Sequence, residues 1–477
     1  MPFLIGFSIV FLTLLIILFA RALTFKPEKQ EAPRCEQIAV DTERATRELS
    51  SLIECRTVSY RNKKLEDNSE FERLERVLPS IFPTVFANFE FEKVGRRGLL
   101  LRWRGASSKS PTVLMAHYDV VAANGDEWIC PPFSPEVIDG FLYGRGTLDT
   151  KLTLSTMLHA AERLLEQGFV PASDVYFAFG GDEETDGTGA SEIAKLFVER
   201  GIYPSLVLDE GGAVVKNLFP RVEKSTAVIG IAEKGLANIS YTVRGGGGHA
   251  STPKGHTPVS RLARAAARVV SRPQPYRLTE TSKTFLLRLS AHSSFGYRFI
   301  FANLWLFSPL LGVITRDGGD LSALIRTTVA FTEMHGAEGA NVIPSEASLI
   351  SNSRILQGDT PERLRRRIEK RIADQNVEVR IVSAQNPSPV SRTDCPEYEK
   401  IEYTVREIWP DSIISPYLML ACSDARSWSQ ICDRVYRFSP LEFVGDERFT
   451  IHGVNERVAL TSIDKSVEFF YRLIKKL

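Results

Sequence analysis

Three short apolar runs in the first half of the chain each end in acidic residues or in histidine. These runs are Val113–Ala116, Val175–Phe179 and Ser205–Leu208. Continuous apolar runs of this length, bounded by polar residues, are typical of strands buried on both faces. Apolar residues at helical spacing lie between the first two runs, over Lys151–Gln167. This alternation predicts an α/β domain whose mixed, mostly parallel sheet is flanked by helices.

The pattern changes in the middle of the chain, where predicted strands and helices follow the order β-α-β-β-α-β. In chain order the segments are Asn238–Arg244, Thr257–Ser271, Thr327–Thr332, Ser348–Ser353, a basic helix that begins at Thr360, and Val377–Val382. This order is typical of a ferredoxin-like α+β fold. A helix near Tyr398–Ile408, a strand near Ser415–Leu420 and a closing helix at Leu460–Leu477 then resume the first pattern. We therefore expect an α+β domain inserted into the α/β domain.

The N-terminus is apolar and free of charge from Phe3 to Ala20, and Arg21 and Lys26 follow. Eighteen residues at about 1.5 Å each nearly span a hydrocarbon core of about 30 Å. No positive charge precedes the run, which favours an uncleaved signal anchor over a cleaved signal peptide. The expected segments are a signal anchor or signal peptide at 1–24, a stalk at 25–42, the two parts of the α/β domain at 43–228 and 387–477, and the inserted domain at 229–386.

Composition narrows the function classes. The chain has 477 residues, a formal net charge of +1, 43% hydrophobic and 25% charged residues. It therefore reads as globular, with no signal for a nucleic-acid partner. Neither a P-loop, a G-x-G-x-x-G motif nor a C-x-x-C motif occurs, so nucleotide and cysteine-zinc sites have no support. The spacing of the six cysteines fits no zinc module. The sequence leaves two alternatives for them, disulfide bonds or scattered free thiols.

Candidate chemistry gathers at the ends of the predicted strands. His117 and Asp119 follow the first run, D-E-E at Asp182 follows the second, and D-E-G-G at Asp209 follows the third. In open α/β sheets the site lies beyond the carboxyl ends of the strands. An isolated acidic run is usually a solvated loop, but three such strand ends favour a metal-assisted hydrolase. Asp119 lies two residues beyond His117 on the same side of an extended chain, where its carboxylate would hold the far imidazole N–H.

Six motifs occur in the order in which one enzyme group has them. They read H-Y-D-V-V from His117, G-R-G-T-x-D-x-K from Gly144, D-E-E from Asp182, L-D-E-G-G from Leu208, G-G-G-H-A-S-x-P from Gly246 and I-H-G-x-N-E from Ile451. From about Glu43 onward the chain resembles the aminoacylase-1/carboxypeptidase S group of two-zinc metallopeptidases. Within that group it is most similar to the membrane-anchored or secreted N-fatty-acyl-amino acid synthase/hydrolase branch.

The resemblance implies a pair of metal ions that share one water. The implied metal ligands are His117, Asp149, Glu184, His452, and either Glu210 or Asp209, of which the motif favours Glu210. Asp149 would bridge the ions, because a carboxylate has two oxygens to share. Glu183 would be the general base, because it is the acid not neutralised by metal. Zinc is the first choice for nitrogen and oxygen ligands, with Mn²⁺ and Co²⁺ as alternatives.

The resemblance also implies residues that contact the substrate. His249 would reach the substrate carbonyl, in one version from the partner subunit of a homodimer formed through the inserted lid or dimerisation domain. Asn341 and Arg354 match positions that hold the substrate carboxylate. The relatives carry a G-G/N-T-D-x-R loop where this chain has Ala421–Arg426. Ser423 keeps a hydroxyl there, but the glycine freedom is lost, which concerns pocket shape and substrate range rather than the metal centre.

One further apolar segment, Phe299–Ile314, carries no charge. It is either a buried helix kinked at Pro309 or an apolar surface that meets a membrane or admits an acyl chain. It is too short to predict a second membrane span.

The first functional hypothesis is a zinc amidohydrolase that cleaves, and also forms, the amide of N-acyl amino acids, fatty-acyl ones included. A carboxypeptidase acting on short peptides is the alternative, and an inactive binding homologue is a third. Secretory relatives and a glycosylation sequence at Asn238 favour a lumenal or extracellular catalytic domain, either membrane-anchored or secreted.

Overall fold

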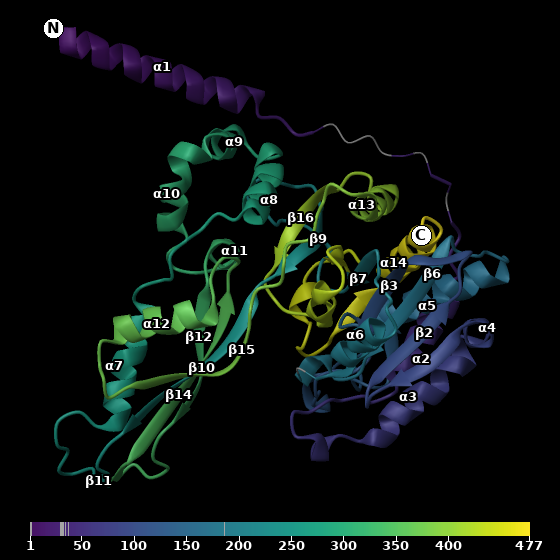
Figure 1. Cartoon of the computed structure of the whole chain (residues 1–477), viewed down its shortest axis with the longest axis horizontal. Helices are drawn as coiled ribbons and strands as arrows, with labels where there is room; N and C mark the ends of the chain where they lie inside the picture. The colour runs from purple at the N-terminus through teal and green to yellow at the C-terminus, as the bar shows by residue number, and fades with distance from the viewer. Residues whose placement is uncertain (1, 29–32, 34, 37, 186) are drawn as a thin grey trace.

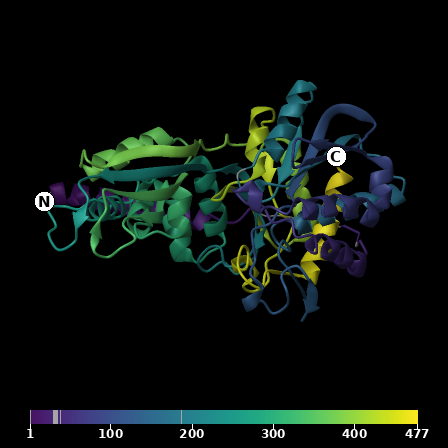
Figure 2. The same ribbon diagram turned by 90° about the horizontal axis from the view of Figure 1, so that it is seen from below.

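The computed structural model describes residues 2–28, 33, 35–36, 38–185 and 187–477. Its two main sheets lie side by side, so the body is elongated, with one sheet and its helices in each half (Figures 1 and 2). Part of the expected stalk, namely residues 29–32, 34 and 37, lies outside the described residues.

The larger sheet has nine strands, eight of which form a continuous path. In order across the sheet they are β1 (Glu90–Val94), β2 (Gly98–Trp103), β6 (Ser173–Gly180), β3 (Ser107–His117), β7 (Leu206–Asp209), β17 (Val435–Arg437), β9 (Thr226–Glu233) and β16 (Ile413–Met419), and β8 (Val214–Val215) pairs with β9. The pairs β3–β6, β3–β7, β7–β17 and β9–β16 are parallel. The expected mixed sheet is confirmed, with as many antiparallel pairs (β1–β2, β2–β6, β9–β17 and β8–β9) as parallel ones. All three predicted runs are strands in this sheet. The run Val113–Ala116 lies near the C-terminal end of β3, which is longer than predicted.

Helices cover both faces of this sheet. One face packs against α2 (Thr42–Ile53), α3 (Asn68–Ile81), α4 (Pro83–Asn88), α5 (Lys151–Glu166), α13 (Pro396–Ile408) and α14 (Leu460–Ile474). The other face packs against α6 (Gly189–Glu199) and the 3-10 helix η4 (Asp424–Gln430). Strand side chains alternate between the two cores, so Phe177 faces the first and Tyr176 the second. Burying a side chain such as Phe177 contributes about 1.5–3 kcal/mol.

The smaller sheet has four antiparallel strands in the order β12 (Thr328–His335), β14 (Glu346–Ile355), β10 (Gly235–Arg244) and β15 (Glu378–Gln385). Two helices, α7 (Pro258–Val270) and α12 (Pro361–Ile372), pack on it. This is the expected ferredoxin-like arrangement. The helix at Thr360 begins as its sequence indicates, because the Thr360 hydroxyl accepts a hydrogen bond from the Arg363 N–H.

One of the crossings between the two halves is a very short link. β9 ends at Glu233 in the larger sheet, and β10 begins at Gly235 in the smaller one. Lys234, between them, is fully buried, and its Nζ donates to the carbonyl oxygens of Ala323 and Arg326.

Further small elements complete the fold. They are a three-stranded sheet of β4 (Glu136–Ile138), β5 (Phe141–Tyr143) and β18 (Arg457–Ala459), a ribbon of β11 (Gly248–His249) and β13 (Val342–Ile343), the helices α8 (Glu280–Ala291) and α11 (Asp320–Ile325), and the 3-10 helices η1 (Lys63–Leu65), η2 (Gly125–Glu127), η3 (Glu183–Thr185) and η5 (Glu447–Phe449). All six cysteines are free thiols.

The apolar segment Phe299–Ile314, for which one alternative was a single helix kinked at Pro309, is broken elsewhere in the structure. It forms two helices, α9 (Phe295–Ala302) and α10 (Leu304–Ile314), which meet at 109°. The break falls at Asn303 rather than at Pro309. Asn303 adopts a non-helical conformation there, and its side-chain amide donates to the carbonyl of Phe299 in α9 and to that of Leu18 in the N-terminal helix α1 (Pro2–Thr24). Pro309 lies inside α10.

Candidate metal centre

Three neighbouring strands bring the candidate residues to one edge of the larger sheet. β3 ends at His117, β6 is followed by η3, which contains Glu183 and Glu184, and β7 is followed directly by Glu210. Because β3 is parallel to both β6 and β7, these carboxyl ends share one edge. The site therefore lies where open α/β sheets place their ligands.

Asp149 lies between the two candidate histidines. Its Oδ1 is 2.8 Å from Nε2 of His117, and its Oδ2 is 2.9 Å from Nε2 of His452. His452 comes from a distant loop near the end of the chain, and its Nε2 is also 3.1 Å from Oε1 of Glu184. Each oxygen of the Asp149 carboxylate thus faces a different imidazole, which is the arrangement that a bridging ligand requires.

Two overlapping groups of ligand atoms meet at this edge. His117, Asp149 and Glu184 form one group, and His117, Glu183 and Glu210 form the other; within each group the atoms lie within 4.8 Å of one another. The donors are imidazole nitrogens and carboxylate oxygens, a set that suits Zn²⁺ and also Mn²⁺ or Co²⁺. The residues present therefore fit a metal centre.

The electrostatics of the cluster favour a bound cation. Burial raises the pKa of both Glu183 and Glu210 well above the usual carboxyl range, and neighbouring carboxylates raise it further against the influence of His117. Hydrogen bonds to Asp149 and Glu184 raise the pKa of His452 to about 10. Several acids are thus crowded into a buried space, where their mutual repulsion is costly unless positive charge is present. Divalent cations would relieve that repulsion.

Asp119 supports the cluster from beneath and is fully buried. Its two carboxylate oxygens accept hydrogen bonds from the backbone N–H groups of Glu183 and Glu184, at 3.1 and 3.2 Å. The expected contact with His117 is present in a modified form. Nδ1 of His117 is 2.9 Å from the Asp119 backbone carbonyl and 3.4 Å from its carboxylate. The backbone oxygen is therefore the nearer partner of the imidazole, and the carboxylate mainly positions the two glutamates.

Of the two adjacent acids at the end of β7, Asp209 and Glu210, only Glu210 faces the histidine. Its Oε1 lies 3.5 Å from Nε2 of His117. The Asp209 carboxylate instead accepts a hydrogen bond of 2.8 Å from the Ala425 N–H in the first turn of η4. The geometry thus favours Glu210 as the ligand and gives Asp209 a role in holding the start of η4.

Sequence reasoning missed Glu456, which is fully buried beside the centre. Its carboxylate accepts hydrogen bonds from the N–H groups of Gly146, Leu148 and Asp149, and it pairs with the Arg145 guanidinium. Glu456 thereby fixes the loop that carries Asp149. The available signal was its place as the last residue of the I-H-G-x-N-E motif, of which only His452 was assigned a role.

The residues expected to contact substrate do not all lie together. His249 and Asn341 are exposed on the loops of the β11–β13 ribbon, where the Ala250 N–H donates to the Asn341 carbonyl. Figure 1 shows this ribbon at the tip of the smaller-sheet half, on the far side of that half from the larger sheet. Within one chain the structure therefore does not bring His249 to the metal-ligand cluster.

Arg354 and Ser423 lie nearer the cluster, at the junction of the two halves. The Arg354 guanidinium is 3.0 Å from the Cys422 sulfur, and the Ser423 hydroxyl donates to Glu233. Glu233 also pairs with Arg426 and Arg437, so the altered loop is held by a buried ionic network.

The cluster opens into a pocket of about 510 Å³. Its polar floor includes Asp149, Glu183, Glu184, Glu210 and His452, and its walls include Leu148, Ala213, Met419, Leu441, Phe443, Phe449 and Ile451. The pocket thus offers a charged floor beside apolar walls.

The chain is similar to known proteins in sequence and in fold. Residues 113–476 match the profile of peptidase family M20/M25/M40. The chain is 34% identical over 412 residues to the probable carboxypeptidase S-like 2 of Dictyostelium discoideum, covering 85% of this chain and 79% of that protein. It is 32% identical over 434 residues to the N-fatty-acyl-amino acid synthase/hydrolase PM20D1 of Homo sapiens, covering 90% and 86%. The crystal structure of the M20 family metallo-carboxypeptidase Sso-CP2 of Sulfolobus solfataricus shares the fold, with a TM-score of 0.68, 15% identity and coverage of 90% and 98%.

Proposed function

The chain belongs to peptidase family M20/M25/M40, and on that premise we propose that it is a two-zinc amidohydrolase of N-acyl amino acids, N-fatty-acyl amino acids included. The observation that carries the proposal is the position of Asp149 between His117 and His452, within the group of carboxylates. The residues that would hold the metal ions are His117, Asp149, Glu184, Glu210 and His452. When bound, the metal pair supplies an ionised water and polarises the amide carbonyl.

Glu183 would act as the general base. It belongs to the ligand-atom group around His117, and Asp119 holds its backbone N–H. With Glu184 assigned to the metal, the Glu183 carboxylate is free to take a proton from the water and pass it to the leaving nitrogen. The reverse reaction, condensation of a fatty acid with an amino acid, would use the same residues in the opposite order.

The pocket supports an acyl substrate. Apolar side chains such as Met419, Phe443 and Phe449 line it beside the acidic floor. An aliphatic chain gains about 25 cal/mol for each Å² of apolar surface that it buries there. Arg354, whose guanidinium lies at the junction of the two halves, would hold the carboxylate of the amino acid.

His249 and Asn341 would complete the site from the partner subunit of a homodimer. Their position at the tip of the smaller-sheet half, away from the cluster of their own chain, supports this proposal. In a symmetric dimer each tip would reach the other subunit's pocket, so both sites would be completed in the same way.

Release of C-terminal residues from short peptides remains the second candidate, because a relative is named as a carboxypeptidase S-like protein. Turnover of N-oleoyl-phenylalanine and of a glycyl-leucine dipeptide separates the two functions. We expect the acyl substrate to have the higher kcat/KM. A clear preference for the dipeptide would overturn the assignment in favour of the carboxypeptidase.

A matched pair of variants tests the acyl wall. Phe449 is 71% exposed and lines the pocket. Val170 is 61% exposed, follows α5 in the chain and does not line the pocket. Phe449→Asp should lower kcat/KM for the oleoyl substrate more than for the dipeptide, and Val170→Asp should change neither. Equal losses for both substrates would show that Phe449 does not contact the acyl chain.

We also propose that the apolar helix α1 (Pro2–Thr24) anchors the protein in a membrane of the secretory system, with the catalytic body on the lumenal or extracellular side. α1 is long and apolar enough to cross a bilayer, and its mean hydropathy is 2.9. Mass spectrometry of the N-terminus of the purified protein would distinguish a retained anchor from a cleaved signal.

A further inference from the structure

The helices α9 and α10 present apolar side chains to the outside of the protein. Residues 295–314 contain a single charged residue, Arg298. Trp305, Val313 and Ile314 are nevertheless 58%, 68% and 60% exposed. Such a concentration of exposed large apolar residues indicates a surface that meets an apolar partner.

The charge of Arg298 is used to bind α1. Its guanidinium donates to the backbone carbonyls of Ala22 and Phe25, at 3.2 and 3.0 Å. In return, Arg21 at the end of α1 donates to the carbonyl of Ala302, the last residue of α9, at 3.0–3.1 Å. Each arginine thus satisfies carbonyls that the end of the other helix leaves without an intrahelical partner.

Asn303, at the break between α9 and α10, adds a third link. Its side-chain amide donates to the carbonyl of Leu18 at 3.0 Å, and the residue is fully buried. The ring of Phe19 lies 6.2 Å from that of Phe295 and 5.1 Å from that of Phe299, centroid to centroid. The final turns of α1 are therefore part of the folded protein and are fixed against α9.

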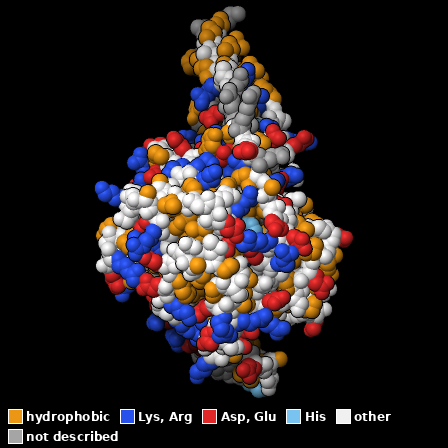
Figure 3. All heavy atoms as spheres, turned by 90° about the vertical axis from the view of Figure 1, so that its right-hand side faces the viewer, with side chains coloured by type: hydrophobic (Ala, Val, Ile, Leu, Met, Phe, Trp, Pro, Cys, Tyr) orange, Lys and Arg blue, Asp and Glu red, His pale blue; other side chains and the backbone are white. Residues whose placement is uncertain are grey.

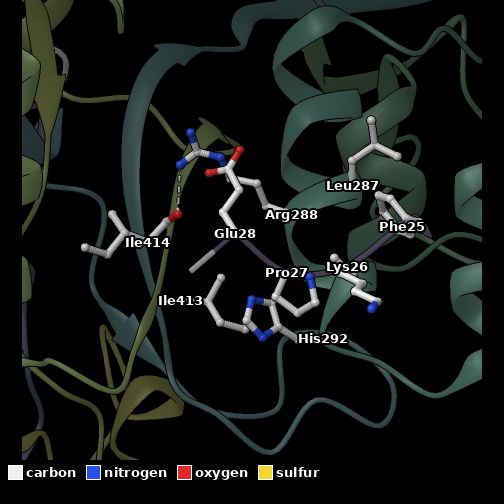
Figure 4. Close-up of a pocket in the computed structure, with 10 residues that line it drawn as sticks. Phe25, Lys26, Pro27, Glu28, Leu287, Arg288, His292, Ile413 and Ile414 are labelled. Atoms are coloured by element: carbon white, nitrogen blue, oxygen red, sulfur yellow. Dashed lines mark hydrogen bonds between the residues drawn. The ribbon is translucent and has the colours of Figure 1, made fainter. Parts of the chain in front are cut away.

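The chain that leaves α1 passes over α8 and the start of β16. Figure 4 shows that Phe25 to Glu28 line a pocket there together with Arg288, His292 and Ile413. The rest of α1 projects from the body (Figure 3), and only 6% of the apolar stretch of this helix is buried. The exposed apolar surface of α9 and α10, together called the α9–α10 hairpin, is therefore continuous with the exposed apolar surface of α1, the proposed membrane anchor.

We propose that the α9–α10 hairpin is a second membrane-binding element, which enters the lipid bilayer beside α1. α10 has 11 residues and is about 16 Å long, which suffices for one leaflet but not for a span. Arg316 and Asp317, directly after α10, are exposed and would remain at the water boundary. The hairpin would thus fix how the catalytic body is held against the membrane, whatever its substrate.

Tryptophan fluorescence tests this placement in the full-length protein reconstituted into phosphatidylcholine vesicles. Trp305 is exposed in α10, whereas Trp103, Trp409 and Trp428 are buried. Lipids brominated on their acyl chains quench tryptophans that contact the hydrocarbon. We expect brominated vesicles to quench the wild type, and Trp305→Phe to remove most of that quenching. Trp128→Phe is the matched control, since Trp128 lies in the larger-sheet half, and it should leave the quenching unchanged.

A second variant separates insertion of the hairpin from anchoring by α1. Leu310→Asp combined with Val313→Asp puts charges on the exposed side of α10. This variant should stay in the vesicle fraction through α1 while Trp305 is no longer quenched. If brominated lipid fails to quench Trp305 in the wild type, or if the double variant is quenched as strongly as the wild type, the hairpin faces water or another protein and the proposal is wrong.

Discussion

Replacing Glu233 with glutamine tests the buried ionic network at the junction of the two halves. Glu233 is fully buried, and its carboxylate accepts hydrogen bonds from Arg437 at 2.6 Å, Arg426 at 2.8 Å and Ser423 at 3.1–3.2 Å. Glutamine keeps the shape but removes the charge. It would leave the Arg437 guanidinium, also fully buried, without an anion in contact. Breaking a buried pair on one side costs about 3–5 kcal/mol.

That cost translates into a large change in melting temperature. At about 2–4 °C for each kcal/mol in a domain of this size, Glu233→Gln should lower the Tm by about 6–20 °C. Near-UV circular dichroism of the metal-loaded full-length protein in detergent measures it. KM should rise as well, because Glu233 holds Ser423 of the loop beside the pocket.

The control is Glu90→Gln, which removes a carboxylate from an exposed pair with Arg102 and Arg104. Exposed pairs contribute about 0–1 kcal/mol, so the control should barely move the Tm. A Tm for Glu233→Gln within the control's range would refute the reasoning.

Acid is a second perturbation of the same group. Burial raises the pKa of Glu233, but the arginines outweigh burial and hold it below its usual 4.5. Its contribution to stability is therefore present above about pH 4.5 and is lost as the pH falls through the folded-state pKa.

Three further predictions concern the catalytic base, the dimer and the link between the halves. Glu183→Gln should lower kcat by about 10²–10⁴-fold with bound metal unchanged; full activity would exclude Glu183 as the base. His249→Ala and Glu183→Gln should each be inactive, yet their equimolar mixture should regain about a quarter of wild-type activity. The reason is that about half of the randomly formed dimers contain one chain of each variant, and one of the two sites in such a dimer is complete. No recovery of activity would exclude completion of the site by the partner. Burial lowers the pKa of the Lys234 amine from 10.5 to about 7 in the folded protein. Between about pH 7 and pH 10.5 the folded protein has therefore lost this proton while the unfolded chain still binds it, so the free energy of unfolding rises with pH in that range. Lys234→Met should flatten that part of a plot of Tm against pH, and an unchanged slope would contradict the buried, perturbed amine.

Much of the fold followed from local patterns. The runs that end at Ala116, Phe179 and Leu208 predicted the central strands, because a strand buried on both faces must be apolar throughout. The same runs located the candidate site, because parallel strands end at the same edge of a sheet. His452, far along the chain from His117, could be added only through its motif, and its contact with Asp149 supports that addition.

Other features depend on contacts that no local pattern encodes. Glu456 supports the loop of Asp149 through hydrogen bonds across some 310 residues of sequence, and its place in the I-H-G-x-N-E motif does not indicate those partners. At the break, Asn303 donates to the Leu18 carbonyl of α1, a partner some 285 residues away that the local sequence does not indicate. The remote position of His249 reflects how the smaller sheet is attached through Lys234, which the order of the strands alone does not determine.

The metal content of the purified protein tests the central claim most directly. Elemental analysis of the wild-type chain should give two zinc ions per chain, and Asp149→Asn, which weakens a carboxylate that faces both histidines, should give fewer than one. Two ions retained in Asp149→Asn, or no more than one in the wild type, would contradict a bridged metal pair at this site.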